Sequence, residues 1–181
     1  MNETNTYKRL KNEPKNNFPE MIIVHHSGGT DLNPLEDTSN QTAQIIEEWH
    51  FSKGWDGLGY HYVIHKNGDV WLGRPEYRNG AHAVGYNTIS IGICVIGNFD
   101  LTLPTKEQEN AVAKLIQAVR GRYPIITQDK IYPHRKFANK TCYGKKLADN
   151  WANLLIPIII SPPNTDKIKI KQAIDILQSL L

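Results

Sequence analysis

The sequence has few features that could stabilise a fold in place of a hydrophobic core. It contains only two cysteines in 181 residues, so a framework of several disulfides is excluded, and Cys94 and Cys142 could form one bridge at most. The longest nearly apolar run, residues 154–160, is interrupted by Pro157 and is far shorter than the roughly 20 residues that span a bilayer. Repeats and low-complexity segments are also absent. We therefore expect a globular chain without a transmembrane helix.

An excess of one charge sign is missing too. Lys and Arg number 21 against 18 Asp and Glu, and this net charge of +3 is too small for a dedicated nucleic-acid-binding protein. The first twenty residues contain Lys and Glu but no apolar block of the kind that a secretory signal needs. We therefore expect synthesis in the cytoplasm, no nucleic-acid partner, and export only by a route other than an N-terminal signal.

Short apolar runs alternate with helical periodicities along the chain. Strands are predicted for residues 21–24, 60–65, 70–72, 90–97 and 131–134, and the second and third are joined by the hairpin signal Asn67-Gly68. Helices are predicted for residues 42–51, 105–121 and 145–155, the second with a capping box formed by Thr105 and Gln108. Strands interleaved with helices predict an α/β fold.

The two ends of the chain differ from its middle. Residues 1–18 are polar and predict a loosely attached N-terminal arm, whereas residues 19–156 carry the predicted core of one domain. Residues 157–181 predict a linker and a C-terminal amphipathic helix, because Ser161-Pro162-Pro163-Asn164 precedes a stripe of apolar residues. We expect this helix to pack on the same domain; contact with a second copy or with a membrane surface is the alternative.

The residue types that zinc prefers are present at three places. They are the pair His25 and His26, then His134, then Cys142. Successive strand residues point to opposite faces, so only one of His25 and His26 is expected to face a given cavity. Taken one at a time, each histidine is better explained by a structural hydrogen bond, and the cysteine by burial as a small apolar residue.

Several motifs in a fixed order carry a resemblance to a known family. They are Gly59-Tyr60-His61-Tyr62, Asn67-Gly68-Asp69-Val70, Gly73-Arg74, the segment from Gly80 to Asn87, Ser90-Ile91-Gly92-Ile93 and Gly97-Asn98-Phe99. Together they resemble the type 2 N-acetylmuramoyl-L-alanine amidases, which include peptidoglycan recognition proteins and the amidase lysozymes of T7-like phages. The resemblance implies a mixed central β-sheet flanked by helices on both faces, with a zinc cleft at one edge.

The resemblance also implies an activity and a site. The activity is zinc-dependent hydrolysis of the amide bond between N-acetylmuramic acid and L-alanine of peptidoglycan, by a chain expected to be a monomer. The family's zinc ligands correspond to His25, His134 and Cys142. Its two catalytic residues correspond to Tyr60 and Lys140, and its substrate contacts correspond to His82 and Asn87. Without the resemblance, Tyr60 and Lys140 would be interpreted as a half-buried strand tyrosine and a solvated lysine.

Departures from the family pattern favour one of its branches. The glutamate of cytoplasmic recycling amidases is replaced by Cys94, and the disulfide of animal recognition proteins has no counterpart. A phage endolysin or bacterial enzyme, acting on the wall after release, is therefore expected. The family's Cys-Pro-Gly reads Cys142-Tyr143-Gly144, which predicts a slightly looser ligand loop. The alternative is a module that binds peptidoglycan without cutting it; such modules lack the ligand cysteine, whereas this chain has Cys142.

Other aromatic residues are expected to be structural. His61 follows Tyr60 and should point to the opposite face of its strand, where a structural hydrogen bond is the better interpretation. Trp49 and Trp55 could form a platform for a sugar, but at their positions core packing is favoured. His50 and His65 are assigned no role.

Overall fold

A mixed β-sheet forms the middle layer of the protein. The computed structural model describes residues 1–29 and 33–156. Within them the strands are β1 (Asn2–Glu3), β2 (Met21–His26), β3 (Tyr62–Ile64), β4 (Val70–Leu72), β5 (Ser90–Val95) and β6 (Ile131–Pro133), in the order β1-β4-β3-β5-β2-β6. Only β3 and β4 are antiparallel, as the Asn-Gly hairpin predicts.

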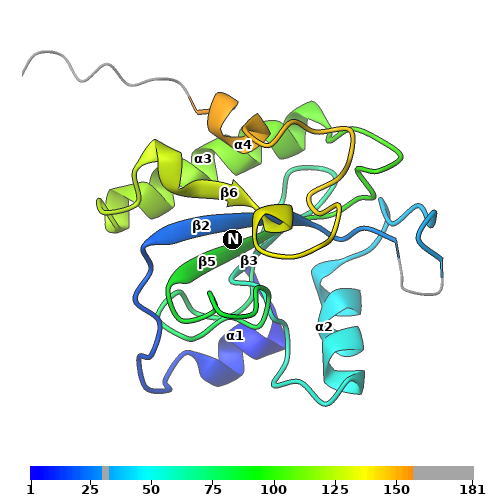
Figure 1. Cartoon of the computed structure of the whole chain (residues 1–181). Coiled ribbons are helices and arrows are strands. Elements are labelled where there is room, and N and C mark those ends of the chain that lie inside the picture. The colour runs from blue at the N-terminus through cyan, green and yellow to red at the C-terminus, as the bar shows by residue number, and fades with distance from the viewer. Residues whose placement is uncertain (30–32, 157–181) are drawn as a thin grey trace, which may run out of the picture.

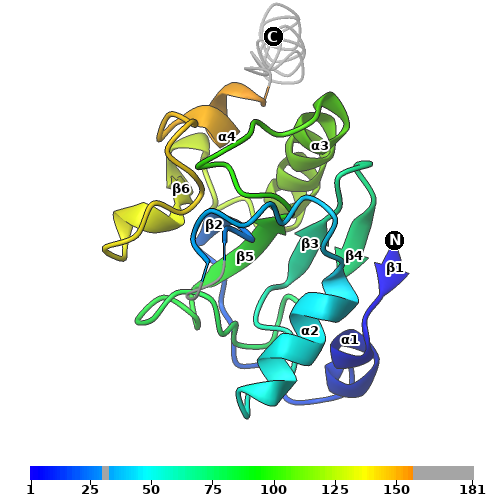
Figure 2. The same cartoon turned by 90° about the vertical axis from the view of Figure 1, so that its right-hand side faces the viewer.

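Helices cover both faces of this sheet, as the resemblance implies. They are α1 (Asn5–Leu10), α2 (Ala43–Ser52), α3 (Lys106–Arg122) and α4 (Trp151–Leu154). In Figure 1, α3 and α4 lie above the sheet and α1 and α2 lie below it, and Figure 2 shows the same layers from the side. The predicted capping box of α3 is present, with the Thr105 hydroxyl accepting from the Gln108 amide.

Strand alternation divides the core into two parts. The larger part lies between the sheet and α3, and it includes Ile22, Val24, Ile91, Ile93, Val95, Val112, Leu115, Ile116 and Val119. The smaller part packs Ala43 and Ile46 of α2 against Val63 and Cys94. Because His25 is the register partner of Cys94, the alternation turns the His25 side chain toward the α2 side of the sheet.

The first residues of the chain differ from the loose arm expected there. β1 pairs with β4, and the backbone amides of Asn5 and Thr6 donate to the buried carboxylate of Glu47 in α2. Thr6 and Leu10 are fully buried. Residues 2–10 are therefore part of the folded unit, because their polar groups find buried partners that lie about forty residues away in the sequence.

The helix predicted for residues 145–155 is also corrected. Only Trp151–Leu154 is α-helical, and residues 145–150 form turns. The Lys145 amide donates to the Asp100 carboxylate and the Lys146 amide donates to the Phe99 carbonyl, which ties this segment to another loop. The amides of Leu147 and Trp151 then donate to carbonyls three residues earlier, as in turns, and not four residues earlier, as in an α-helix. The predicted C-terminal helix lies outside the described residues. Among the residues described, no helix is both long and apolar enough to cross a membrane.

Candidate active site

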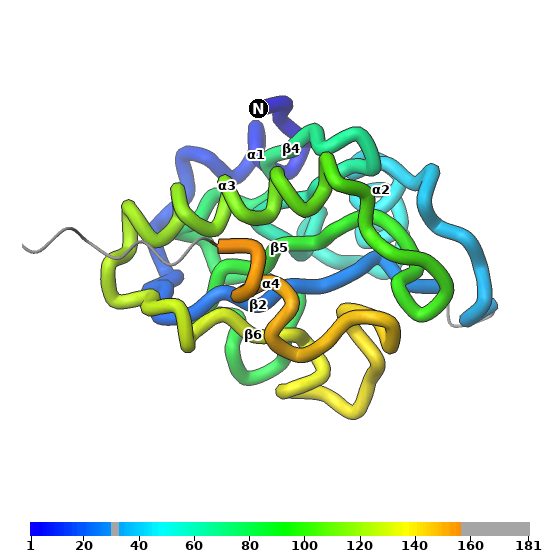
Figure 3. The backbone as a smooth tube through the Cα atoms, turned by 90° about the horizontal axis from the view of Figure 1, so that it is seen from above, coloured from blue at the N-terminus to red at the C-terminus, as the bar shows by residue number. Residues whose placement is uncertain are grey.

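The candidate site lies where the parallel strands β5, β2 and β6 end together. Figure 3 shows these three strands side by side. His25 is the fifth residue of β2, and His134 directly follows β6. Val24 of β2 pairs in register with Pro133 of β6, so the residues that follow them, His25 and His134, lie at the same level. The carboxyl ends of parallel strands are the usual place for a site in an α/β sheet.

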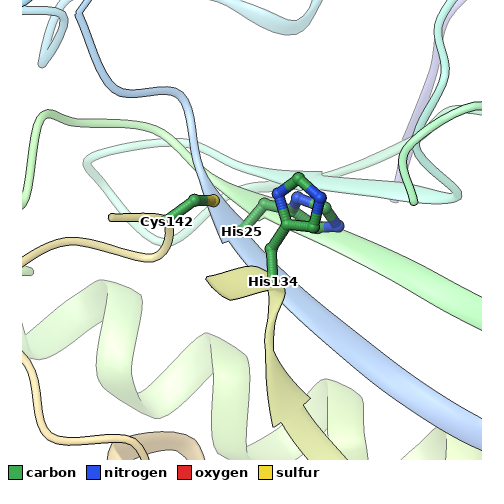
Figure 4. Close-up of side chains that lie close together, drawn as sticks. All are labelled: His25, His134 and Cys142. Atoms are coloured by element: carbon green, nitrogen blue, oxygen red, sulfur yellow. The ribbon is translucent and has the colours of Figure 1, made fainter. Parts of the chain in front are cut away.

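Three side chains that could hold a metal ion meet at this edge. One donor atom each of His25, His134 and Cys142 lies within 4.8 Å of the other two. Figure 4 shows that they come from β2, from the end of β6 and from the loop that follows it. His25 and Cys142 are buried, and His134 is half-buried. Two imidazoles and one thiol suit zinc and leave a fourth position for water or substrate.

The surroundings of Cys142 are compatible with a thiolate ligand. The backbone amide of His26 donates to Sγ of Cys142 at 3.4 Å. With no ion present, burial raises the pKa of the Cys142 thiol to about 12, although that amide and the nearby Lys140 favour the thiolate. A bound cation reverses this preference, because a coordinating thiol is deprotonated. The donor set therefore fits a zinc ion.

The loop that carries Cys142 is held by the Arg135 side chain. The Arg135 guanidinium donates to the carbonyls of Thr141, Gly144 and Leu147 and pairs with the Asp149 carboxylate. The fully buried Tyr143 ring lies beside the same guanidinium, and its hydroxyl donates to the Asp149 carbonyl. The slightly looser loop expected from the missing proline therefore has several compensating contacts.

We expect Arg135→Met to destabilise the protein by about 2–3 kcal/mol, because hydrogen bonds that involve a charged group contribute roughly 1.5–3 kcal/mol. The loop carbonyls would also lose their partner, so zinc affinity should fall. Urea denaturation of the metal-free protein measures the first effect. Lys136→Met, which changes the neighbouring exposed residue, is the control. Equal stability of the two variants would contradict this role of Arg135.

His61 has the structural role predicted for it, and His26 has a similar one. Nδ1 of His26 accepts from the Phe99 amide at 3.0 Å. Nδ1 of His61 accepts from the Gly92 amide at 2.9 Å, and Nε2 of His61 donates to the Arg78 carbonyl at 2.9 Å. Burial lowers the pKa of each ring to about 4. Both imidazoles are therefore neutral at pH 7.

His82 contacts the site through His25. Its Nδ1 lies 3.1 Å from Nε2 of His25, and the two rings meet edge to face. Burial first, and nearby histidines second, lower the pKa of both rings well below the ordinary value. Neither ring therefore carries a charge at neutral pH. Asn87 is also at the cleft, but its Oδ1 accepts from the backbone amides of His82 and Ala83 and so shapes their loop.

Tyr60 and Lys140 border the same cleft as the three candidate ligands. The Tyr60 ring lies 5.1 Å from the His25 ring, between centroids. Burial, with Cys94 and Cys142 nearby, raises the pKa of Tyr60 well above its usual value, so the phenol remains a hydrogen-bond donor. Lys140 is exposed, and its charge adds to burial in lowering the pKa of His134. Two donors therefore flank the candidate metal centre.

The cleft has a volume of about 780 Å³ and a rim of aromatic residues. Trp49 and Trp55 line it and are 46% and 40% exposed, so the core packing favoured for them is wrong. His50 lies between them, stacked on Trp55 at 4.6 Å between centroids, and it accepts from the Gly59 amide beside Tyr60. Trp49 points outward because α2 covers the sheet with its opposite side, through Ala43 and Ile46, and Trp55 lies beyond the end of this helix.

Sequence reasoning missed several residues that shape the site. Arg135 stands next to His134, but its partners are backbone carbonyls that no motif reveals. His50 was assigned no role, yet it orients the Tyr60 segment. Gly92 in β5 could have signalled the close approach of a side chain, since glycine in a strand often marks such a place.

The fold and the site are those of an α/β protein with a mixed sheet and an open cleft, in which two histidines and a cysteine form a candidate metal centre.

Comparison with known proteins then gives the family. A model of the N-acetylmuramoyl-L-alanine amidase family matches residues 15–145, and the chain belongs to this family. The endolysin of Escherichia phage T7 is 43% identical over 138 residues, which are 73% of this chain and 85% of the phage protein. Peptidoglycan-recognition protein SC2 of Drosophila melanogaster is 30% identical over 141 residues, 76% of each chain.

Solved structures agree with this assignment. The N-acetylmuramoyl-L-alanine amidase LysC from Clostridium intestinale superposes with a TM-score of 0.67 at 30% sequence identity, over 95% of this chain and 96% of LysC. The mixed sheet with helices on both faces, implied by the resemblance, is thus confirmed as the fold of this family.

Proposed function

We propose that the protein is a zinc-dependent amidase that cuts the bond between N-acetylmuramic acid and L-alanine of peptidoglycan. The observation that carries this proposal is the meeting of His25, His134 and Cys142 at one edge of the cleft, within 4.8 Å of one another. Membership of the amidase family and similarity to phage endolysins support it. The zinc ligands, catalytic residues and substrate contacts that the family resemblance implies are part of this proposal.

Each group in the cleft has a task in such a reaction. When bound by the three ligands, zinc lowers the pKa of water and polarises the scissile carbonyl. Negative charge would develop on the carbonyl oxygen during attack, and the Lys140 ammonium and the Tyr60 phenol are proposed to donate hydrogen bonds to it. The raised pKa of the half-buried Tyr60 keeps its phenol protonated, so it can donate at neutral pH. His82 and Asn87 border the cleft and are proposed to contact the muramyl or peptide part.

A peptidoglycan-binding module without activity is the second candidate, because recognition proteins are among the relatives. The presence of Cys142 beside both histidines favours the enzyme, since a module that only binds has no need of an ion with an open position. The products of digestion distinguish the two. An amidase releases peptides with a new free amino group on L-alanine from purified sacculi, whereas a binding module pellets with the sacculi and releases none.

We expect Trp49→Ala to raise KM for glycan-bearing muropeptides by roughly two- to tenfold, because stacking on an aromatic ring contributes about 0.5–1.5 kcal/mol. Trp49 lines the cleft and is 46% exposed, with the Lys53 ammonium 3.6 Å from its ring centroid. Phe51, 42% exposed on the same helix, does not line the cleft, so Phe51→Ala is the matched control. Steady-state kinetics measure both, and an unchanged KM in Trp49→Ala would reject a sugar platform.

A further inference from the structure

The His82 ring sits in a slot that two glycines create. A Cβ atom at Gly80 would lie 2.4 Å from Cδ2 of His82, and one at Gly92 would lie 2.5 Å from the same atom. Side-chain atoms essentially never approach so closely, so neither position accepts a larger residue while the ring stays in place. Asn87 also holds the His82 backbone, because its Oδ1 accepts from the His82 amide at 2.9 Å. The ring is therefore held firmly against His25.

Three hydrogen bonds run in line from the Tyr86 backbone to His25. Oγ of Ser90 lies 2.6 Å from the Tyr86 carbonyl oxygen and 3.5 Å from Nε2 of His82. Nδ1 of His82 lies 3.1 Å from Nε2 of His25. A carbonyl oxygen only accepts hydrogen bonds, so the hydroxyl proton of Ser90 is committed to Tyr86.

This commitment determines every other proton in the line. Ser90 Oγ can only accept from His82, so Nε2 of His82 carries the ring proton and Nδ1 is its acceptor. Nε2 of His25 faces that acceptor and therefore carries a proton of its own. A neutral imidazole has one donor and one acceptor nitrogen, so the lone pair of His25 is on Nδ1.

We propose that His82, set in its tautomer by Ser90, is a positioning residue that makes Nδ1 of His25 the metal-binding atom. Histidine ligands usually donate their second ring N–H to a carboxylate, a backbone carbonyl or water, and this partner fixes tautomer and orientation. Here a second imidazole takes that part. The proposal deepens the function proposed above and rests on it only for the identity of the ion.

The tautomers are tested directly by long-range proton–nitrogen NMR correlation of the ¹⁵N-labelled, metal-free protein at neutral pH. We expect the proton of His25 on Nε2 and that of His82 also on Nε2, with signals assigned through His82→Asn and His61→Asn variants. A His25 ring protonated on Nδ1 would overturn the proposal. The measurement needs neither metal nor substrate, so its outcome is independent of whether the protein proves to be an amidase.

Zinc affinity, measured by competition with a chromophoric chelator, tests the positioning role. His82→Phe removes the acceptor and should weaken zinc binding by roughly 10- to 100-fold, the usual effect of losing such a partner. His82→Asn keeps an acceptor oxygen where Nδ1 was, so its affinity should stay within a few-fold of wild type. Ser90→Ala, the smaller change, should give an intermediate loss. Equal affinities in Ser90→Ala and wild type, or in His82→Asn and His82→Phe, would contradict the role.

Discussion

Cys142→Ser is expected to lose most of its bound zinc and to fall by about 10³-fold or more in hydrolysis of peptidoglycan. Serine cannot supply an anionic sulfur ligand, and its hydroxyl is not ionised at neutral pH. The metal contributes several kcal/mol to catalysis, and each 1.4 kcal/mol corresponds to a factor of ten. Elemental analysis of the purified variant and release of stem peptides from sacculi measure the two effects.

The second cysteine provides a matched control. Cys94 is fully buried and is the register partner of His25, but it does not belong to the three-residue group. Cys94→Ala should therefore keep its zinc. An active, zinc-replete Cys142→Ser protein would contradict the ligand assignment. Loss of zinc from both variants would also contradict it, because a disturbed fold would then explain the loss.

Tyr60→Phe and Lys140→Ala are each expected to keep zinc and to lose about 10² or more in kcat, as when one donor to a developing oxyanion is removed. Both side chains line the cleft, but neither belongs to the candidate ligand set. Zinc content should therefore stay at wild-type level while turnover falls. Steady-state kinetics on a soluble muropeptide, with elemental analysis of the same samples, separate these effects.

Controls for these variants come from residues of the same type outside the cleft. Lys146 is exposed in the segment after Cys142, and Tyr132 lies on β6 with its ring against Phe137. Neither lines the cleft, so Lys146→Ala and Tyr132→Phe should retain near wild-type kcat. Wild-type kinetics in both Tyr60→Phe and Lys140→Ala would contradict the catalytic roles. Tyr60 would then be a half-buried structural tyrosine, and Lys140 a solvated surface lysine.

Local patterns were sufficient to predict most of the sheet and the long helix. The residues from Ser90 to Gly97 are nearly all apolar and mostly β-branched, and the structure buries the whole of β5 between β3 and β2. Thr105 and Gln108 mark the start of α3 by a capping contact that lies entirely within the first turn. Such features depend on residues close together in the sequence, and for this reason the sequence reveals them.

Features that depend on distant partners could not be predicted in this way. The polar segment around Thr6 looks unstructured until the buried Glu47 is placed beside it. Trp49 lies on a helix and has a largely apolar ring, which suggests burial. Its exposure depends on which side of α2 packs against the sheet, and the sequence does not show this. Residue types single out the candidate ligands, but only the family resemblance joins them into one site. The distance from His25 to Cys142 along the chain carries no signal, whereas the ends of β2 and β6 bring the residues together.

We propose that hydrolysis depends on one zinc ion at His25, His134 and Cys142. Removing metal from the protein with a chelator and restoring zinc stepwise tests this dependence, when zinc content is followed together with release of stem peptides from purified sacculi. We expect no release by the metal-free protein and a linear recovery that ends at one zinc per chain, with no recovery in Cys142→Ser. Full release by metal-free protein, or sacculus binding without any release at one zinc per chain, would contradict it.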